Sequence, residues 1–444
     1  MSKEEQQDLV VEFQGRQADI AEACVGCGAC FDVCPITAPA GLDGADPEFV
    51  TKGVRAILKG EEAPEEAEAW TKTCVLSGEC IDACEHGVNP RLMLAMARMS
   101  LAERDVADKT RRKSGQGSFR TMANGVKTLS QIQLTPEDLR RLGQGPESTV
   151  TKDGAPPEVL FYTGCNVLKT PHIALLCLDV MDALGDRYQV VGGPSHCCGV
   201  LQYRTGDYET SARIATNSIE KFAKTGAGTV LSWCPTCQVQ FGEIGLPMYE
   251  GTGHDKPFEM TPFILYLADN LDRLGPHLTQ SVKQRVALHL HPGVRGLPAA
   301  ARKILDAVPG VEVVDLDQPQ IGLMSNALST LPEYKKELQA AELTAAEAAG
   351  VDALVAVYHA DHRELCAHER DWPFQVINMM ELVAASMGIV RDDYFKRLKI
   401  KQDVDAVLDD CADMLTLHRI SVDKARPVIE MALLGEQPVP LRGR

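Results

Sequence analysis

The feature that most constrains this chain is a run of four closely spaced cysteines in CVGCGACFDVCP, residues 24–35. The spacing is C-x2-C-x2-C-x3-C followed by proline, with the cysteines at Cys24, Cys27, Cys30 and Cys34. Zinc sites favour paired C-x2-C units across a longer loop, whereas this spacing is typical of iron–sulfur cubanes. The fourth cysteine of such a run binds the other cluster of a two-cluster fold. The run therefore predicts a ferredoxin-like N-terminal domain.

A second run, CVLSGECIDACEHG at residues 74–87, has the same spacing but carries Ser77 where a cysteine is expected. Crossed ligation then predicts two cofactor-binding sets. One is Cys24, Cys27, Cys30 and Cys84, and the other is Cys34, Cys74, Cys80 and whatever occupies position 77. At Ser77 the corner can be lost to leave a [3Fe-4S] cluster, the serine oxygen can bind iron, or water can fill the site. A decayed second cluster is the fourth alternative.

Charge and targeting signals narrow the class of protein. The net charge of −17 argues against nucleic acid, which requires clustered Lys and Arg. The N-terminus has no apolar signal region, and the longest apolar runs are too short for a membrane helix. The fifteen cysteines are therefore expected to be metal ligands or redox groups, rather than disulfides, in a reducing compartment. We expect a cytoplasmic protein, with any membrane association made through a partner.

From residue 156 onward, short β-rich segments alternate with helical ones, which predicts an α/β domain with a largely parallel sheet. The six expected strands are EVLFYTG, YQVVGG, TVLSW, RVALHLH, VEVVDL and ALVAVY. They form two similar sets of three, so we expect a duplicated α/β unit. The predicted division is 1–102 ferredoxin-like domain, 103–155 linker, 156–280 first half, 281–395 degenerate second half and 396–444 helical tail.

Five cysteines follow the three strands of the first half: Cys165, Cys197, Cys198, Cys234 and Cys237. The carboxyl ends of parallel strands meet at one edge of a sheet, so we expect these thiols to converge. Adjacent cysteines in HCCG suit a multi-iron cluster better than one tetrahedral zinc. The equivalent places of the second half hold Gly293, Ser325, Asn326, His359 and His362. The two halves are thus predicted to differ in ligand chemistry.

Histidines of the second half form a further candidate group. His289 and His291 alternate on an expected strand, and HADH places His359 and His362 on a turn expected to approach them. Four imidazoles there could bind zinc or iron, could handle protons, or could simply pack in a degenerate repeat. Cys177, outside the motifs, is expected to be a buried helix residue.

The motif C-x31–39-C-C-G-x34–36-C-x2-C, carried by YTGC, HCCG and WCPTC, resembles the CCG motif of heterodisulfide reductases. The N-terminal part is similar to their ferredoxin-type (C-type) subunit, and residues 156 to about 390 are similar to their B-type subunit. The fusion is similar to the D-type subunit. The resemblance implies that each CCG motif binds a non-cubane [4Fe-4S] cluster that performs disulfide chemistry. It assigns that catalytic role here to Cys165, Cys197, Cys198, Cys234 and Cys237.

Together these features predict an iron–sulfur oxidoreductase subunit that acts on sulfur groups within a heterodisulfide-reductase-like complex. No G-x-G-x-x-G follows an expected strand, so flavin or nicotinamide is expected on a partner, such as a flavoprotein or another subunit. A sulfur-carrier protein or a thiol is the expected substrate, and the direction of electron flow stays open. The alternative is a non-catalytic electron relay, similar to the iron–sulfur subunits of glycolate or lactate oxidases. A third reading is a zinc-binding scaffold.

Overall fold

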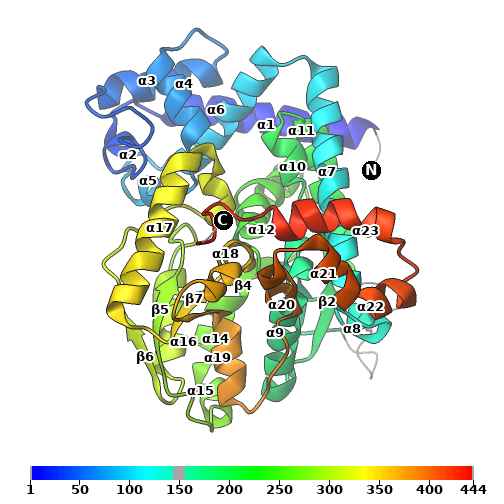
Figure 1. Ribbon diagram of the computed structural model, residues 1–444. Helices are drawn as coiled ribbons and strands as arrows, with labels where there is room; N and C mark the ends of the chain where they lie inside the picture. Colours follow the sequence, from blue (N-terminus) through cyan, green and yellow to red (C-terminus); the bar gives the residue numbers. More distant parts are fainter. Residues whose placement is uncertain (1–2, 144–155, 443–444) are drawn as a thin grey trace.

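The computed structural model describes residues 3–143 and 156–442. An α-rich N-terminal region lies against two four-stranded parallel sheets, each with helices on its faces (Figure 1). All strands of the described residues lie beyond residue 156. The predicted fold class, a small α-rich domain followed by a duplicated α/β domain, is confirmed.

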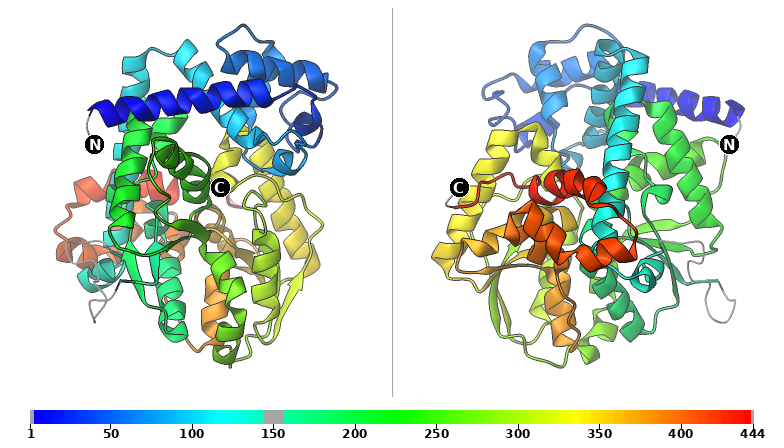
Figure 2. Two further views of the ribbon diagram at one scale, coloured as in Figure 1. Left: turned by 180° about the vertical axis from the view of Figure 1, so that it is seen from behind. Right: turned by 45° about the vertical axis from the view of Figure 1, so that its right-hand side comes forward.

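Six helices build the N-terminal region. They are α1 (Lys3–Ala23), α2 (Ala29–Asp32), α3 (Pro47–Leu58), α4 (Glu65–Thr73), α5 (Glu79–Asp82) and α6 (Pro90–Asp105). The single turns α2 and α5 lie inside the two cysteine runs, and each begins after a left-handed glycine. Helix α6 begins where the sequence predicts, because the Asn89 side chain accepts a hydrogen bond from Leu92 N at 3.1 Å. The long helix α1 lies along the first half and contacts α11 (Tyr208–Ala223; Figure 2).

The range 103–155 differs from its expected form. Helix α7 (Asp108–Gln131) and the short helix α8 (Pro136–Arg141) lie where a linker was expected. Gly115 of α7 marks a close contact, since a Cβ there would lie 2.9 Å from Thr205 Oγ1. Residues 144–155 of the expected linker lie outside the described residues. The domain boundaries stay predictions.

The first sheet has the order β2-β1-β3-β4, and all its strands are parallel. Its strands are β1 (Val159–Tyr162), β2 (Tyr188–Val191), β3 (Thr229–Ser232) and β4 (Glu259–Pro262). The intervening helices are η1 (Asn166–Lys169), α9 (Pro171–Leu184), η2 (Pro194–His196), α10 (Val200–Arg204), α11, α12 (Pro235–Val239), η3 (Gln240–Gly245) and α13 (Leu246–Gly251).

The second sheet repeats this topology in the order β6-β5-β7-β8. Its strands are β5 (Gln284–His289), β6 (Val311–Val314), β7 (Ala353–Ala356) and β8 (Gln375–Asn378). All six expected strands are present. Strands β4 and β8, which have four residues each and pair on one side only, were not expected from the sequence. Pro262 at the end of β4 is tolerated because an edge strand leaves part of its backbone unpaired.

The two halves pack against each other through equivalent helices. Helix α19 (Met379–Ser386) contacts α9, and α14 (Phe263–Asp269) contacts α16 (Leu297–Asp306). Ile173, Leu267, Ile304 and Val383 from these four helices belong to one apolar core. The shared core makes the duplicated unit one structural block, in which burial of apolar area is the main stabilising contribution. The other helices here are α15 (Leu271–Leu274), η4 (Gly275–His277), η5 (Ser325–Thr330), α17 (Pro332–Ala349), α18 (His359–Leu365) and η6 (Cys366–Arg370).

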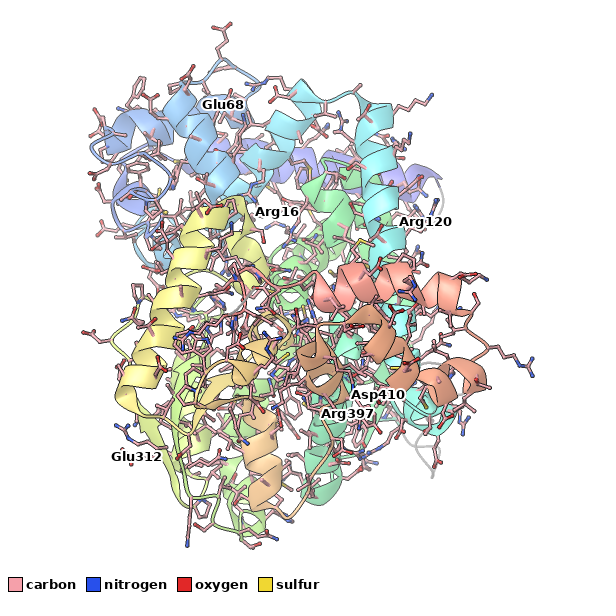
Figure 3. The ribbon with its side chains drawn as sticks, in the orientation of Figure 1. Arg16, Glu68, Arg120, Glu312, Arg397 and Asp410 are labelled. Carbon is pink, nitrogen blue, oxygen red and sulfur yellow. The ribbon has the colours of Figure 1, made fainter. Side chains whose placement is uncertain are left out.

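The C-terminal helices cover one side of this block. They are α20 (Tyr394–Lys401), α21 (Val404–Asp410), α22 (Ala412–Leu417), α23 (Val422–Val428) and η7 (Ile429–Leu434). Arg397 of α20 pairs with Asp410 of α21 at 2.8 Å (Figure 3). Helix α23 and η7 contact α7, so the helix of the expected linker joins the N-terminal region to the C-terminal one.

Candidate functional site

The two cysteine runs meet where α2 contacts α5. Burial raises the pKa of Cys24, and the charge of Cys84 raises it further, which places Cys84 beside Cys24. Burial likewise raises the pKa of Cys30 to about 12, with Cys24 and Cys27 as its charged neighbours. The structure therefore brings Cys84 to the first three cysteines, as the crossed arrangement predicts. Their role as cluster ligands stays a prediction.

The other predicted set gathers around Trp70. The indole Nε1 of Trp70 donates a hydrogen bond to Cys34 Sγ at 3.3 Å. Burial is the largest cause of the raised pKa of both Cys34 and Cys80, and Cys74 is a neighbouring charge for each. Ser77 is half-buried in the loop that joins Cys74 to α5. The three cysteines of this set lie together.

The Ser77 loop docks on the α/β block through backbone groups. Val75 O accepts a hydrogen bond from Leu323 N at 3.0 Å. Arg91 of α6 donates to Leu76 O at 3.3 Å and forms a largely buried ion pair with Glu243 of η3. The second cysteine run is thus held against both halves.

All five cysteines of the first half lie at the carboxyl ends of three strands. Cys165 follows β1, Cys197 and Cys198 follow η2, and Cys234 and Cys237 lie at the start of α12. The thiols of Cys197 and Cys237 interact directly with Cys198, and these hydrogen bonds lower the pKa of Cys198. Burial raises the pKa of Cys165 to about 12, with Cys198 and Cys234 as charged neighbours. The predicted convergence is present.

Tyr162, which the sequence analysis missed, lies at the centre of this group. It ends β1, and its hydroxyl donates to His196 O at 2.7 Å and lies 3.7 Å from Cys237 Sγ. Burial raises its pKa, and four of the five cysteines are its charged neighbours. Only its position near the end of the expected strand EVLFYTG could have indicated this role.

The five cysteines differ in exposure. Cys197, Cys198 and Cys237 are each 2% exposed, whereas Cys165 and Cys234 are partly exposed. Five converging thiols, none of them in a disulfide, fit an iron–sulfur group, because iron stabilises thiolates that burial alone would keep protonated. Buried Lys169 adds a positive charge near Cys165 and pairs with Glu436 at 2.6 Å.

The equivalent place in the second half is filled by protein. A Cβ on Gly293 would lie 2.7 Å from Leu323 Cα and 2.8 Å from Leu76 O. A cysteine therefore has no room at this position, because the Ser77 loop packs against it. Ser325 Oγ donates to Asp361 Oδ1 at 2.6 Å, so Ser325 is engaged within the second half.

His289, His291, His359 and His362 of the second half do not form one site, contrary to the expected arrangement. The rings of His289 and His291 lie 5.2 Å apart and face Asp361. His362 turns away and bonds Asp393 at 2.6 Å, in a group with His172 and Glu381.

His359 belongs to neither group. Burial lowers its pKa to about 3. Asp361 also lies within HADH, but only the imidazoles of that segment were expected to be ligands. The sequence gives no signal for His172, which comes from α9 of the first half.

Two family models match the chain. Residues 20–88 match the family described as a 4Fe-4S dicluster domain, a range that includes both cysteine runs. Residues 159–242 match the family described as a cysteine-rich domain, a range that includes all five cysteines of the first half.

Similar proteins include heterodisulfide reductase subunits. The D-type subunit of the dihydromethanophenazine:CoB–CoM heterodisulfide reductase of Methanosarcina barkeri is 26% identical over 325 residues, covering 67% of this chain and 75% of the relative. The corresponding protein of Methanosarcina mazei is 27% identical over 322 residues, with the same coverage. The glycolate oxidase iron–sulfur subunit of Escherichia coli is 24% identical over 242 residues, covering 51% of this chain and 59% of the relative.

These matches confirm the resemblance to the D-type subunit of heterodisulfide reductase. The chain is an iron–sulfur protein related to that subunit, and the iron–sulfur subunit of glycolate oxidase is a further relative. Among the helices of residues 3–143 and 156–442, none has both the length and the apolar composition needed to cross a membrane.

Proposed function

We propose that the chain is the iron–sulfur subunit of an oxidoreductase complex and that the five-cysteine site performs thiol, disulfide or persulfide redox chemistry. The observation that carries the proposal is the contrast within that site. Cys197, Cys198 and Cys237 are almost fully buried, while Cys165 and Cys234 are partly exposed as residues. Buried thiols suit permanent iron ligands, and the two partly exposed residues suit the approach of a sulfur group.

The proposed ligands follow the predicted sets. Cys24, Cys27, Cys30 and Cys84 would hold one cubane, and Cys34, Cys74 and Cys80 with Ser77 would hold a second cubane or a [3Fe-4S] cluster. Cys165, Cys197, Cys198, Cys234 and Cys237 would hold a non-cubane [4Fe-4S] cluster. When bound, these clusters supply one-electron transfer and an iron able to take a sulfur ligand.

The protein groups around Cys165 support a sulfur substrate. Lys169 places a buried positive charge beside Cys165, which favours an anionic thiolate or persulfide over a neutral thiol. The Tyr162 hydroxyl is committed to His196 O, so it orients the thiol of Cys237 rather than moving a proton. A flavoprotein or a related subunit is the proposed electron partner, and a sulfur carrier or small thiol is the proposed substrate.

The test is low-temperature EPR of the anaerobically purified full chain in its oxidised state, with and without 2-mercaptoethanol. We expect the thiol to change the spectrum of the wild type without any redox partner. Cys165→Ser should abolish this response. The control Cys177→Ser should keep it, because Cys177 is buried in α9 outside the site. A spectrum that the thiol leaves unchanged contradicts the proposed chemistry.

A non-catalytic relay is the second candidate. It is favoured by the similarity to the glycolate oxidase iron–sulfur subunit and by the absence of cysteines from the ligand places of the second half. With Gly293 packed against the Ser77 loop, only one half offers a multi-thiol site. Under this alternative, a flavoprotein would reduce the clusters, but an added thiol would leave their EPR spectrum unchanged.

A further inference from the structure

The second half contains a buried group of three metal-binding side chains that the proposed function does not use. His289, His291 and Asp361 present ligand atoms that all lie within 4.8 Å of one another. The three residues are 6%, 3% and 0% exposed. The first two come from the end of β5 and the residues after it, and Asp361 comes from the first turn of α18.

Inward-facing atoms of this group have no hydrogen-bond partner. Within the part of the chain that the structure describes, His289 Nε2, His291 Nε2 and Asp361 Oδ2 are buried and unpaired. Leaving a buried polar atom unpaired costs about 1–3 kcal/mol, so three at one point require an explanation.

The outer atoms of the same side chains fix the proton positions. His291 Nδ1 lies 2.6 Å from Ile321 O, and a carbonyl oxygen can only accept, so Nδ1 carries the proton. His289 Nδ1 lies 2.5 Å from Glu342 Oε2 and donates to that carboxylate in the same way. In the neutral rings both Nε2 atoms then point lone pairs at Asp361, which also offers only lone pairs.

Three acceptors facing one another repel unless a proton or a metal ion lies between them. We propose that His289 Nε2, His291 Nε2 and the Asp361 carboxylate bind one divalent first-row transition-metal ion. His291 Nε2 lies 3.4 Å from Asp361 Oδ1. Two ligands each ~2.1 Å from a tetrahedral zinc ion are about 3.4 Å apart, which matches that separation.

The outer contacts also match those of known metal sites. A metal-bound histidine donates its other ring nitrogen to a carboxylate or a backbone carbonyl, and these are the partners of His289 and His291. Ser325 N and Oγ fix Asp361 Oδ1 at 3.0 and 2.6 Å. Two imidazoles and one carboxylate, without thiolate, suit zinc or ferrous iron and leave at least one coordination position open. The inference goes beyond the proposed function and does not depend on it.

The first test is anomalous scattering from crystals of the anaerobically purified full chain, at energies around the zinc and iron absorption edges. We expect one peak between the three side chains, separate in space from the iron of the cysteine sites. A peak that appears only on crossing the zinc edge identifies zinc, and a peak that appears on crossing the iron edge identifies iron. Electron density without any peak at either edge means that the site holds only a proton, which overturns the proposal.

Variants give the second test, by metal analysis in solution. Asp361→Asn and His291→Gln should each lose about one metal ion per chain, with circular dichroism confirming that both still fold. The matched control is His359→Gln, a buried histidine of the same turn that lies outside the group. It should keep the ion. Folded Asp361→Asn protein with wild-type metal content would overturn the assignment.

Discussion

Ser77 occupies the position in the second cysteine loop that Cys27 occupies in the first. Gly26 and Gly28 flank Cys27 with φ of 73° and 86°, and Leu76 and Gly78 flank Ser77 with φ of 61° and 85°. A leucine rarely adopts a positive φ, so its presence shows that the loop keeps the shape of the intact run. The backbone is therefore already arranged for a cysteine at position 77.

Ser77→Cys should restore the missing ligand without moving the backbone. We expect the oxidised wild type to show the near-isotropic EPR signal of a three-iron cluster, and Ser77→Cys to lose that signal and gain a second cubane signal on reduction. Ser118→Cys, on the exposed side of α7, serves as the control and should resemble the wild type. If the wild type already shows two cubane centres on reduction, serine or water completes the cluster.

At the residue scale, the sequence predicted the sites whose ligands follow a characteristic spacing. Cysteine runs and the HCCG motif gave the sites that the structure brings together. Asp361 was not predicted as a site residue, because its partners His289 and His291 are distant in sequence and come near it only through the pairing of β5 with β7. Tyr162 was not predicted as a site residue, because aromatic residues at strand ends are common in apolar cores.

Helix α7 illustrates a limit at the scale of elements. Its polar, glycine-containing sequence is typical of a linker, yet Gly115 lies against Gln202 and Thr205 of the first half. Tertiary packing therefore stabilises this helix despite the low helix propensity of its sequence. The six predicted strands are β-rich runs that the sequence shows directly. Strand β4 has no apolar run and ends in proline, whereas β8 was missed although three of its four residues are buried.

Leucine substitutions on α7 test this packing. Gly115→Leu should lower the free energy of unfolding by roughly 1–3 kcal/mol, because the side chain has no room beside Thr205. Gly117→Leu faces open space and should gain up to about 1 kcal/mol from better helix propensity. Urea unfolding followed by circular dichroism measures both. Equal effects would mean that α7 does not pack closely at Gly115.

The ion pair between α6 and η3 tests how the N-terminal helices are fastened. Arg91→Ala leaves Glu243 without its buried partner, and we expect a loss of about 2–4 kcal/mol in urea unfolding. The comparison is Arg104→Ala, which removes an exposed pair with Glu68 and should leave stability near the wild type. Equal stabilities of the two variants would show that the Arg91 contact does not fasten the domain.

At the scale of the whole molecule, the two halves share one topology but differ at their strand ends. The first half keeps its strand ends for five thiols. In the second half, Gly293 stands at the position equivalent to Cys165, and the loop of the second cysteine run packs against it. This contact places the N-terminal cysteines against the α/β block. Sequence could predict the repeat, but not that one copy had become a docking surface for another domain.

Glu436 ties the C-terminal segment to both halves, since it pairs with Lys169 at 2.6 Å and with Arg363 at 2.7 Å. Burial alone would raise the pKa of Glu436, but the two cations lower it well below the usual range. A carboxyl group with a lowered folded-state pKa stabilises the protein above its unfolded pKa of about 4.3 and loses this contribution as the pH falls below it.

Glu436→Gln should therefore be less stable than the wild type by about 2 kcal/mol or more at pH 7, because it leaves two buried cations unpaired. The difference should stay constant from pH 8 to about 5 and narrow below pH ~4, where the unfolded wild type takes up the proton. Urea unfolding across this range measures it. The exposed variant Glu333→Gln, whose pair with Lys336 lies within one turn of α17, should follow the wild type at every pH. A Glu436→Gln difference that grows as the pH falls would contradict the assigned charge state.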